Sequence, residues 1–447
     1  MQLQDALDVT ANLVDLKSFE HFRKHLDPAW IEMAIDDSGT WTLRQRRLPA
    51  DQMVWLVIAM GLFRDRPIEE IVDKLELARP GRDGTAVAAS SISEARGKLG
   101  CEPLEWLFSY SGLKWGIKSA DSHRYRGLSV LGVDGTVQRA ADSDDNRTYF
   151  GGPTGKRGAS AYPLVRIVTL MALRSHLLVA ARLGPYAKSE SAYARDLWDS
   201  VPDDSLSVVD RLFLAAGTLI PLSSKGKNRH WLTRAKKNTR YRVVEKLGRG
   251  DEILEMEVSA RARKIDPTLP THWRMRAIRY QRKGFLPQLL LTSLVDHKAY
   301  PASEIVGLYH ERWELEIGLD EIKTEMLERE ESLRSKTPAR VCQEAWGLLI
   351  AYNLVRLEME RVADELGIAP TRISFVAALR EIRDEWIWLE ATKPGAIPQR
   401  LKKLRARIKR FILPARRTDR AYPRAVKIKM TAYPRKRRPA AATGKDT

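Results

Sequence analysis

Three acidic residues of this chain have the residue type and the placement needed to hold divalent metal ions. Asp134 follows an apolar run at residues 127–133, and Asp210 follows a second run at 206–209. Both runs predict short buried strands that end at a carboxylate. Glu316 adds a third carboxylate from a segment of helical composition. Mg²⁺ prefers such oxygen ligands, and two ions about 4 Å apart can hold both oxygens exchanged in phosphodiester chemistry.

The two aspartates also have a simpler interpretation, because turns that follow strands favour Asp. Spacing alone does not choose between a turn residue and a metal ligand. The basic composition of the chain favours the metal site, since a centre of carboxylates and metal in a basic protein suits chemistry on nucleic-acid phosphates.

Glu316 belongs to a helical pattern that carries three further polar residues on one stripe. Tyr309, Arg312, Glu316 and Lys323 are 0, 3, 7 and 14 positions along the segment. At about 100° per residue, these offsets place all four within about 60° of each other. A hydroxyl, a guanidinium and an ammonium around a carboxylate suit contacts with phosphate. The alternative is an ordinary solvated charged face.

The net charge of +19 indicates a polyanionic partner, with double-stranded DNA the first candidate. Most of this charge lies at the C-terminal end, where residues 400–447 hold 18 Lys or Arg and two acids. We expect a basic helix at 401–412 and disorder beyond it. The cluster Arg435, Lys436, Arg437 and Arg438 is suited to phosphate contacts, which need no base sequence. A solubilising tail is the alternative.

The order of patterns along the chain predicts a mixed α/β protein in five parts. Residues 1–120 form a helical domain, including helices at 51–63 and 69–77 and one capped by Ser91. We expect this domain to contact DNA, with an ordinary helical surface as the alternative. Residues 121–237 form the first part of an α/β core. Residues 238–295 form a β-rich insertion, 296–395 complete the core with helices, and 396–447 form the basic C-terminal segment.

Several other classes of protein are disfavoured. Two cysteines make no ligand cluster or disulfide framework and fit a reduced, cytoplasmic setting. No stretch reaches the length of a membrane span, and no signal peptide is evident. Neither Gly-rich motif that binds nucleotide phosphates is present, so we expect no nucleotide cofactor.

Asp134-Gly135-Thr136, Val209-Asp210-Arg211 and the Tyr309, Arg312, Glu316, Lys323 pattern, in this order and spacing, resemble the DDE transposases of bacterial insertion sequences. The likeness is to the insertion-sequence-4 family and its Tyr-Arg-Glu-Lys signature, and it covers about residues 1–390. It implies a ribonuclease-H-like core with a β-rich insertion before the glutamate-bearing helix.

The resemblance also implies roles. Asp134, Asp210 and Glu316 would hold Mg²⁺, for which Mn²⁺ can substitute. Tyr309, Arg312 and Lys323 would hold DNA phosphates near the transposon end. It implies a homodimer on DNA, nicking by water, and a hairpin formed when the freed 3′-OH attacks the opposite strand. Reopening of the hairpin and attack on target DNA would follow.

The chain departs from the family pattern at Gln288, where some members carry a Trp that stacks on a flipped base. Either Trp231 or Trp273 takes that role, or the base is held differently. We expect Asp320, where some members have a second Lys, to be solvated. Two alternatives to a transposase remain, a metal-dependent DNA nuclease of the same fold and a transposase-derived regulator without catalysis.

Overall fold

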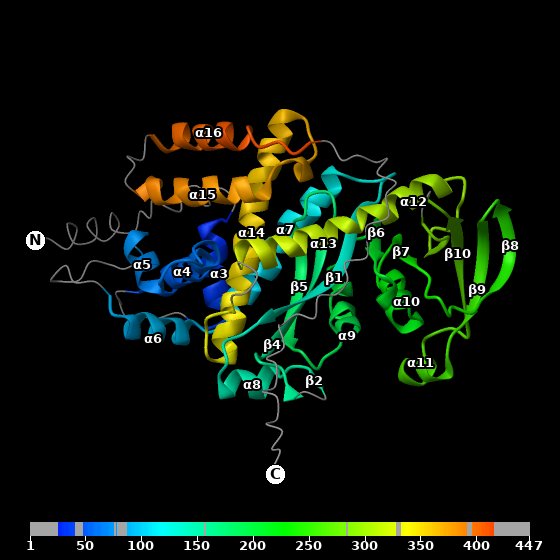
Figure 1. Ribbon diagram of the computed structural model, residues 1–447, viewed down its shortest axis with the longest axis horizontal. Coiled ribbons are helices and arrows are strands. Elements are labelled where there is room, and N and C mark those ends of the chain that lie inside the picture. Colours follow the sequence, from blue (N-terminus) through cyan, green and yellow to red (C-terminus); the bar gives the residue numbers. More distant parts are fainter. Residues whose placement is uncertain are drawn as a thin grey trace, which may run out of the picture.

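A mixed sheet with helices on both faces forms the centre of the molecule. The computed structural model describes residues 26–40, 48–75, 77, 87–155, 158–282, 285–327, 332–390 and 396–414. Figure 1 shows the N-terminal helices and the helices α15 and α16 at one end of the long axis, and the last strands of the sheet at the other.

Nine strands form this sheet in the order β5-β4-β1-β6-β7-β11-β10-β9-β8. β1 pairs antiparallel with β4 and parallel with β6, and β6 pairs parallel with β7. The core strands are β1 (Ser129–Arg139), β4 (Leu164–Ala172), β5 (Leu178–Pro185), β6 (Ser205–Val209) and β7 (Arg229–Arg234). A separate hairpin pairs β2 (Thr154–Gly155) with β3 (Gly158–Ala159).

The segment 238–295, predicted to be β-rich, contains four strands that extend the same sheet, because β11 pairs antiparallel with β7. They are β8 (Arg242–Gly248), β9 (Asp251–Glu257), β10 (His272–Tyr280) and β11 (Gln288–Thr292). A short helix that the sequence did not predict, α11 (Ala260–Ile265), lies between β9 and β10.

Alternate residues of the core strands enter two separate hydrophobic cores, as the two-residue period of a strand requires. Val130 packs in one core and its neighbour Leu131 in the other. The core containing Leu131 is covered by α9 (Glu190–Arg195) and α10 (Ala216–Ser224). The core containing Val130 is covered by α7 (Glu102–Ser122) and α14 (Pro338–Leu366).

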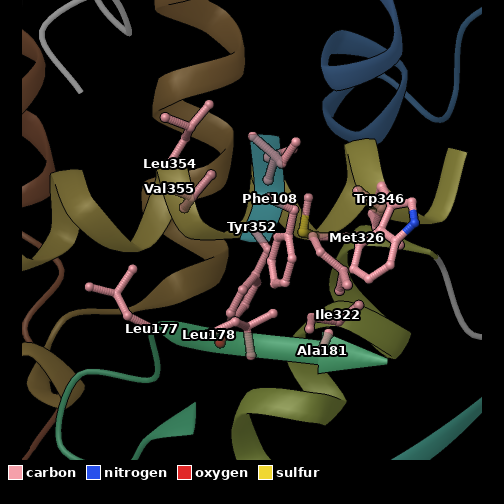
Figure 2. Close-up of a cluster of buried hydrophobic side chains, with 14 of the residues drawn as sticks. Phe108, Leu177, Leu178, Ala181, Ile322, Met326, Trp346, Tyr352, Leu354 and Val355 are labelled. Carbon is pink, nitrogen blue, oxygen red and sulfur yellow. The ribbon is translucent and has the colours of Figure 1, made fainter. Parts of the chain in front are cut away.

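The first core continues into the N-terminal helices. Gly61 of α4 and Gly347 of α14 allow a close helix crossing, since a Cβ on Gly347 would lie 2.6 Å from the Val57 carbonyl oxygen. Figure 2 shows Phe108, Trp346 and Tyr352 in this core beside side chains of β5. The N-terminal helices are α3 (Pro28–Asp37), α4 (Ala50–Leu62), α5 (Ile68–Lys74) and α6 (Ala89–Leu99).

Two predictions about helices were wrong in detail. Ser91 is not an N-cap, because α6 begins at Ala89 and Ser91 lies within its first turn. The basic helix begins earlier than predicted, as α16 (Ile397–Ile408), and its charges are largely paired. Arg405 contacts Glu358, and Arg407 contacts acids of α15 (Phe375–Glu390). Those side chains are therefore not free for phosphate.

The predicted helix around Glu316 consists of three consecutive segments. α12 (Ala302–Glu311) and α13 (Trp313–Asp320) meet at Arg312, which keeps a helical backbone at φ −51° and ψ −29°. A π-helical segment, Glu321–Met326, follows directly. Ile322 and Met326 of this segment point into the core that Figure 2 shows. π-turns are uncommon and often occur at functional sites.

Candidate active site

Asp134 and Asp210 lie on neighbouring strands at the same level of the sheet. Val133 of β1 is the parallel partner of Val209 of β6. Asp134 directly follows Val133, and Asp210 directly follows Val209. This register brings the two acids together from elements 76 positions apart, as their numbers give. Because both strands run in the same direction, the two aspartates lie next to each other where this pairing ends.

The prediction that Asp134 ends its strand was wrong. β1 continues to Arg139, and Asp134 itself is paired with Thr169 of β4. Only the parallel partner stops here, since β6 ends at Val209. The apolar run in the sequence thus ends where β6 stops pairing with β1. Beyond that point β1 remains paired with β4 only.

Glu316 is carried toward this edge of the sheet by a close contact between α13 and β1. A Cβ on Gly132 would lie 2.7 Å from a Leu315 methyl group, so α13 packs directly over β1 at this glycine. Gly132 and Asp134 share one face of the strand, because they are two residues apart. Glu316 follows Leu315 and is 40% exposed.

The Glu316 carboxylate is bound to Arg312 in this structure. Arg312 Nη2 donates a hydrogen bond to Glu316 Oε1 over 2.8 Å. In the described part of the chain, no group of three or more His, Cys, Asp or Glu side chains is arranged to hold a metal ion. The structure thus brings Asp134 and Asp210 together, while Glu316 lies nearby on α13 with its charge paired to Arg312.

Glu190, the first residue of α9, is an acid at this site that the sequence analysis missed. A Cβ on Gly135 would lie 2.7 Å from the Glu190 carboxyl carbon, which places that carboxyl group beside Asp134. Burial, the Glu190 charge and a hydrogen bond with Glu190 raise the pKa of Asp134 to about 7, against a backbone hydrogen bond and Arg312. No motif marks Glu190, because it begins a helix of only six residues.

This donor set fits a divalent cation. Asp134 and Glu190 are adjacent carboxyls, and Arg166 Nη1 lies 3.7 Å from Glu190 Oε2. A hard cation would offset the burial and the repulsion from Glu190 that raise the pKa of Asp134. Asp134 and Asp210 are the residues that would hold it, and Glu316 lies on α13 with its charge paired to Arg312.

A pocket of about 310 Å³ opens beside Asp210 and contains two of the predicted DNA contacts, Tyr309 and Arg312. Burial raises the pKa of Tyr309, against the charge of Arg312. Burial would lower the pKa of Arg312, but its hydrogen bond to Glu316 and the charges of Tyr309, Glu316 and Asp210 raise it. Arg234, Tyr280, Arg282, Phe285, Gln288, His310 and Trp313 complete the lining.

A second hollow, of about 740 Å³, adjoins the first and shares Arg234, Phe285 and Gln288 with it. Its charged lining is entirely basic: Arg211, Arg234, Lys236, Lys237 and Arg279. The two pockets together make a basic groove that leads from Asp210 along β11. The sequence analysis missed these cations because they are scattered over strand ends and linkers rather than gathered in one motif.

Other predicted residues have varied outcomes. Lys323 is exposed and lies in the π-helical segment. Because a π-helix has more residues per turn than an α-helix, Lys323 is rotated away from the stripe of Tyr309, Arg312 and Glu316 on which a continuous α-helix would place it. Asp320 is exposed, as predicted.

Trp231 and Trp273 cannot stack on a base, because both are buried and pack on each other with 5.1 Å between their ring centroids. Trp313 is 42% exposed and lines the first pocket. Arg435, Lys436, Arg437 and Arg438 lie outside the described residues.

Comparison with known proteins agrees with this geometry. Residues 125–354 match the Transposase DDE domain, and residues 16–109 match the Insertion element 4 transposase N-terminal domain. These matches define the class as DDE transposases, which transfer phosphoryl groups of DNA. Over 436 residues the chain is 36% identical to Transposase InsG for insertion sequence element IS4 of Escherichia coli (strain K12), covering 97% of this chain and 98% of that protein. The chain belongs to the IS4 family of DDE transposases.

Two further relatives are more partial or more distant. Putative transposase InsZ of Escherichia coli (strain K12) is 35% identical over 246 residues, which are 54% of this chain and 81% of that protein. The cryo-EM structure of the piggyBac transposase synaptic complex with hairpin DNA covers 90% of this chain and 87% of its own, at 10% identity and a TM-score of 0.46. No described helix has the length and apolarity of a membrane span.

Proposed function

We propose that this transposase binds the terminal inverted repeats of an insertion sequence, cuts the DNA there and joins the freed ends to target DNA. The observation that carries this proposal is the register of Val133 with Val209, which sets Asp134 beside Asp210 at the mouth of a basic pocket. Carboxylates next to cations are what phosphodiester chemistry needs, since the former hold metal and the latter hold phosphate.

Asp134, Asp210 and Glu316 would hold two Mg²⁺ ions, with Mn²⁺ as a substitute. When bound, such ions supply positive charge to both oxygens exchanged at the scissile phosphate. We further propose a ribonuclease-H-like core, which the order β5-β4-β1-β6-β7 supports. The family pattern leads us to propose a hairpin intermediate and a homodimer on DNA.

Tyr309, Arg312 and Lys323 would bind phosphates of the transposon end. Arg312 can grip a phosphate with two parallel hydrogen bonds, and Lys323 adds an exposed point charge. The basic groove along Arg211, Lys236 and Arg279 would accept the adjoining backbone. Tyr280 and Trp313 offer aromatic surface at the pocket for an unstacked base, in place of the buried Trp231 and Trp273.

A linear duplex that carries the inverted repeat, incubated with Mg²⁺ and the full chain, tests this function. We expect a nick at the repeat, followed by a hairpin end. Glu316→Gln should abolish cleavage and leave binding to the end intact, whereas Asp320→Asn, on the exposed side of α13, should cleave normally. Cutting without end specificity would favour a nuclease. Binding without cutting, unchanged in Glu316→Gln, would favour a regulator.

A further inference from the structure

The tight turn between β4 and β5, residues 173–177, makes hydrogen bonds to α12 and to α13, on both sides of Arg312. Arg174 Nε and Nη2 donate hydrogen bonds to the two carboxylate oxygens of Glu311, each over 2.9 Å. His176 Nε2 lies 2.8 Å from Glu314 Oε2. Glu311 is the last residue of α12, and Glu314 lies in the first turn of α13. One turn of the sheet therefore holds both helices where they meet.

The hydrogen bonds around His176 determine which nitrogen carries the proton. Arg356 Nη2 lies 2.6 Å from His176 Nδ1, and a guanidinium only donates. Nδ1 must therefore accept, which leaves the proton on Nε2, where it is donated to Glu314. The ring thus links Arg356 of α14 to Glu314 of α13 in one defined direction.

The contact between His176 and Arg356 is deeply buried, and further hydrogen bonds hold Arg356 in place. His176 is 1% exposed, and Arg356 is 1% exposed. Arg356 also donates to Glu321, the first residue of the π-helical segment, and Tyr352 Oη donates to the same carboxylate over 3.0 Å. Partnered buried charges hold a defined geometry, because breaking one pair leaves the other charge uncompensated.

His176 also has a left-handed backbone conformation. Its φ of 64° lies in the left-handed region, where Asn, Asp and His are more common than other non-glycine residues. The turn that produces this conformation is closed by the His176 amide, which donates to the Ala172 carbonyl over 2.8 Å.

The position of Glu314 relative to Glu316 gives this contact a consequence for the active site. Two residues along a helix correspond to about 200°, so the side chains leave α13 in nearly opposite directions. The hydrogen bond of Glu314 with His176 on the buried side of α13 therefore fixes the rotation of this helix about its axis. That rotation decides where Glu316 points on the outer side.

We propose that the β4–β5 turn positions Glu316 and Arg312, with His176 acting through Glu314 and Arg174 acting through Glu311. His176 and Arg174 are positioning residues, since neither reaches the carboxylates of the site. The inference rests on the proposed role of Glu316 as a metal ligand. It adds a device that sets this ligand from the opposite face of its helix.

Two substitutions of His176 separate positioning from folding. His176→Gln can place an amide N–H near the position of Nε2 and so still reach Glu314. His176→Asn suits the left-handed backbone better but is too short to reach Glu314. The full chain carrying each change is tested for end cleavage at saturating DNA and Mg²⁺, well below the Tm of every variant. Lys225→Ala, which removes a remote exposed pair with Asp199, is the matched control.

We expect His176→Asn to cleave about tenfold or more slowly, because a small displacement of a ligand costs at least that much, with the DNA Kd unchanged. His176→Gln should recover most of the rate, and Lys225→Ala should match the parent chain. In the double variant of His176→Asn with Glu314→Gln, the loss should not exceed the larger single loss, since both remove one contact. A purely structural role predicts the reverse order, with Asn tolerated better than Gln, and that result would overturn the proposal.

Mn²⁺ binding to the DNA-free Arg312→Ala chain, in which Glu316 is released from its ion pair, gives a readout independent of cleavage when it is followed by the loss of the free-ion EPR signal. In this background His176→Asn should weaken Mn²⁺ binding and His176→Gln should restore it. Equal Mn²⁺ affinity with and without His176→Asn would refute the positioning role. If the Arg312→Ala chain binds Mn²⁺ through Glu316 while the parent chain cuts no DNA, the proposed function fails while the positioning role stands.

Discussion

Arg312 donates a hydrogen bond to Glu316 one helical turn away, with 2.8 Å between Nη2 and Oε1. The same guanidinium acts electrostatically on Asp134 and Asp210. One cation therefore compensates three acids that a divalent metal would otherwise neutralise. If the proposed function holds, a DNA phosphate that draws Arg312 away would release Glu316 toward the two aspartates and would so couple binding of the end to assembly of the metal site.

Replacing Arg312 should separate these two roles. Arg312→Ala frees Glu316 and removes a nearby positive charge, so Mn²⁺ should bind the DNA-free protein about two- to fivefold more tightly, as an i,i+4 ion pair is worth about 0.3–1 kcal/mol. Binding to the inverted repeat should weaken about tenfold. Arg312→Lys keeps the charge and should leave the Mn²⁺ affinity near that of the parent chain. Weaker Mn²⁺ binding in Arg312→Ala would contradict this competition.

The contact of Leu315 with Gly132 should control the distance between α13 and β1. A Cβ at position 132 would lie 2.7 Å from methyl groups of both Leu173 and Leu315. Gly132→Ala should therefore lift α13 slightly and slow end cleavage about tenfold, while DNA affinity is retained. Adding Leu315→Ala should restore part of the rate by making room. Rates that fall further in the double variant would argue against this steric explanation.

Much of this site could be predicted because its residues belong to regular patterns. Asp210 follows a clean apolar strand, and the spacing of Tyr309, Arg312 and Glu316 is helical. Glu190 and His176 could not be found this way, since one begins a short helix and the other lies in a turn. The π-helical segment changes the period on which the placement of Lys323 rested, and strand alternation buries Trp231 and Trp273.

Glu304, in the first turn of α12, should make stability depend on pH. Hydrogen bonds from Arg126 and Tyr125 lower the pKa of Glu304 from 4.5 to about 2. A carboxyl whose pKa is lowered on folding stabilises the protein above its unfolded pKa, and this contribution is lost as the pH falls through the folded pKa. The Tm deficit of Glu304→Gln should therefore be constant above about pH 5 and shrink toward about pH 2. Tm measured across this range tests the assignment, and a deficit independent of pH would count against it.

The crossing of α4 and α14 should tolerate no side chain at Gly347. A Cβ there would lie 2.6 Å from the Val57 carbonyl oxygen, which is backbone and cannot rotate away. We expect Gly347→Ala to cost about 1–3 kcal/mol of the free energy of unfolding, despite the better helix propensity of Ala. Gly307→Ala is the matched control, because α12 leaves nothing within 4 Å of that Cβ and helical Ala should stabilise by about 0.5–1 kcal/mol. Thermal unfolding followed by circular dichroism should show Tm shifts of opposite sign. A Gly347→Ala variant as stable as the parent chain would mean that the two helices can separate at this crossing without loss.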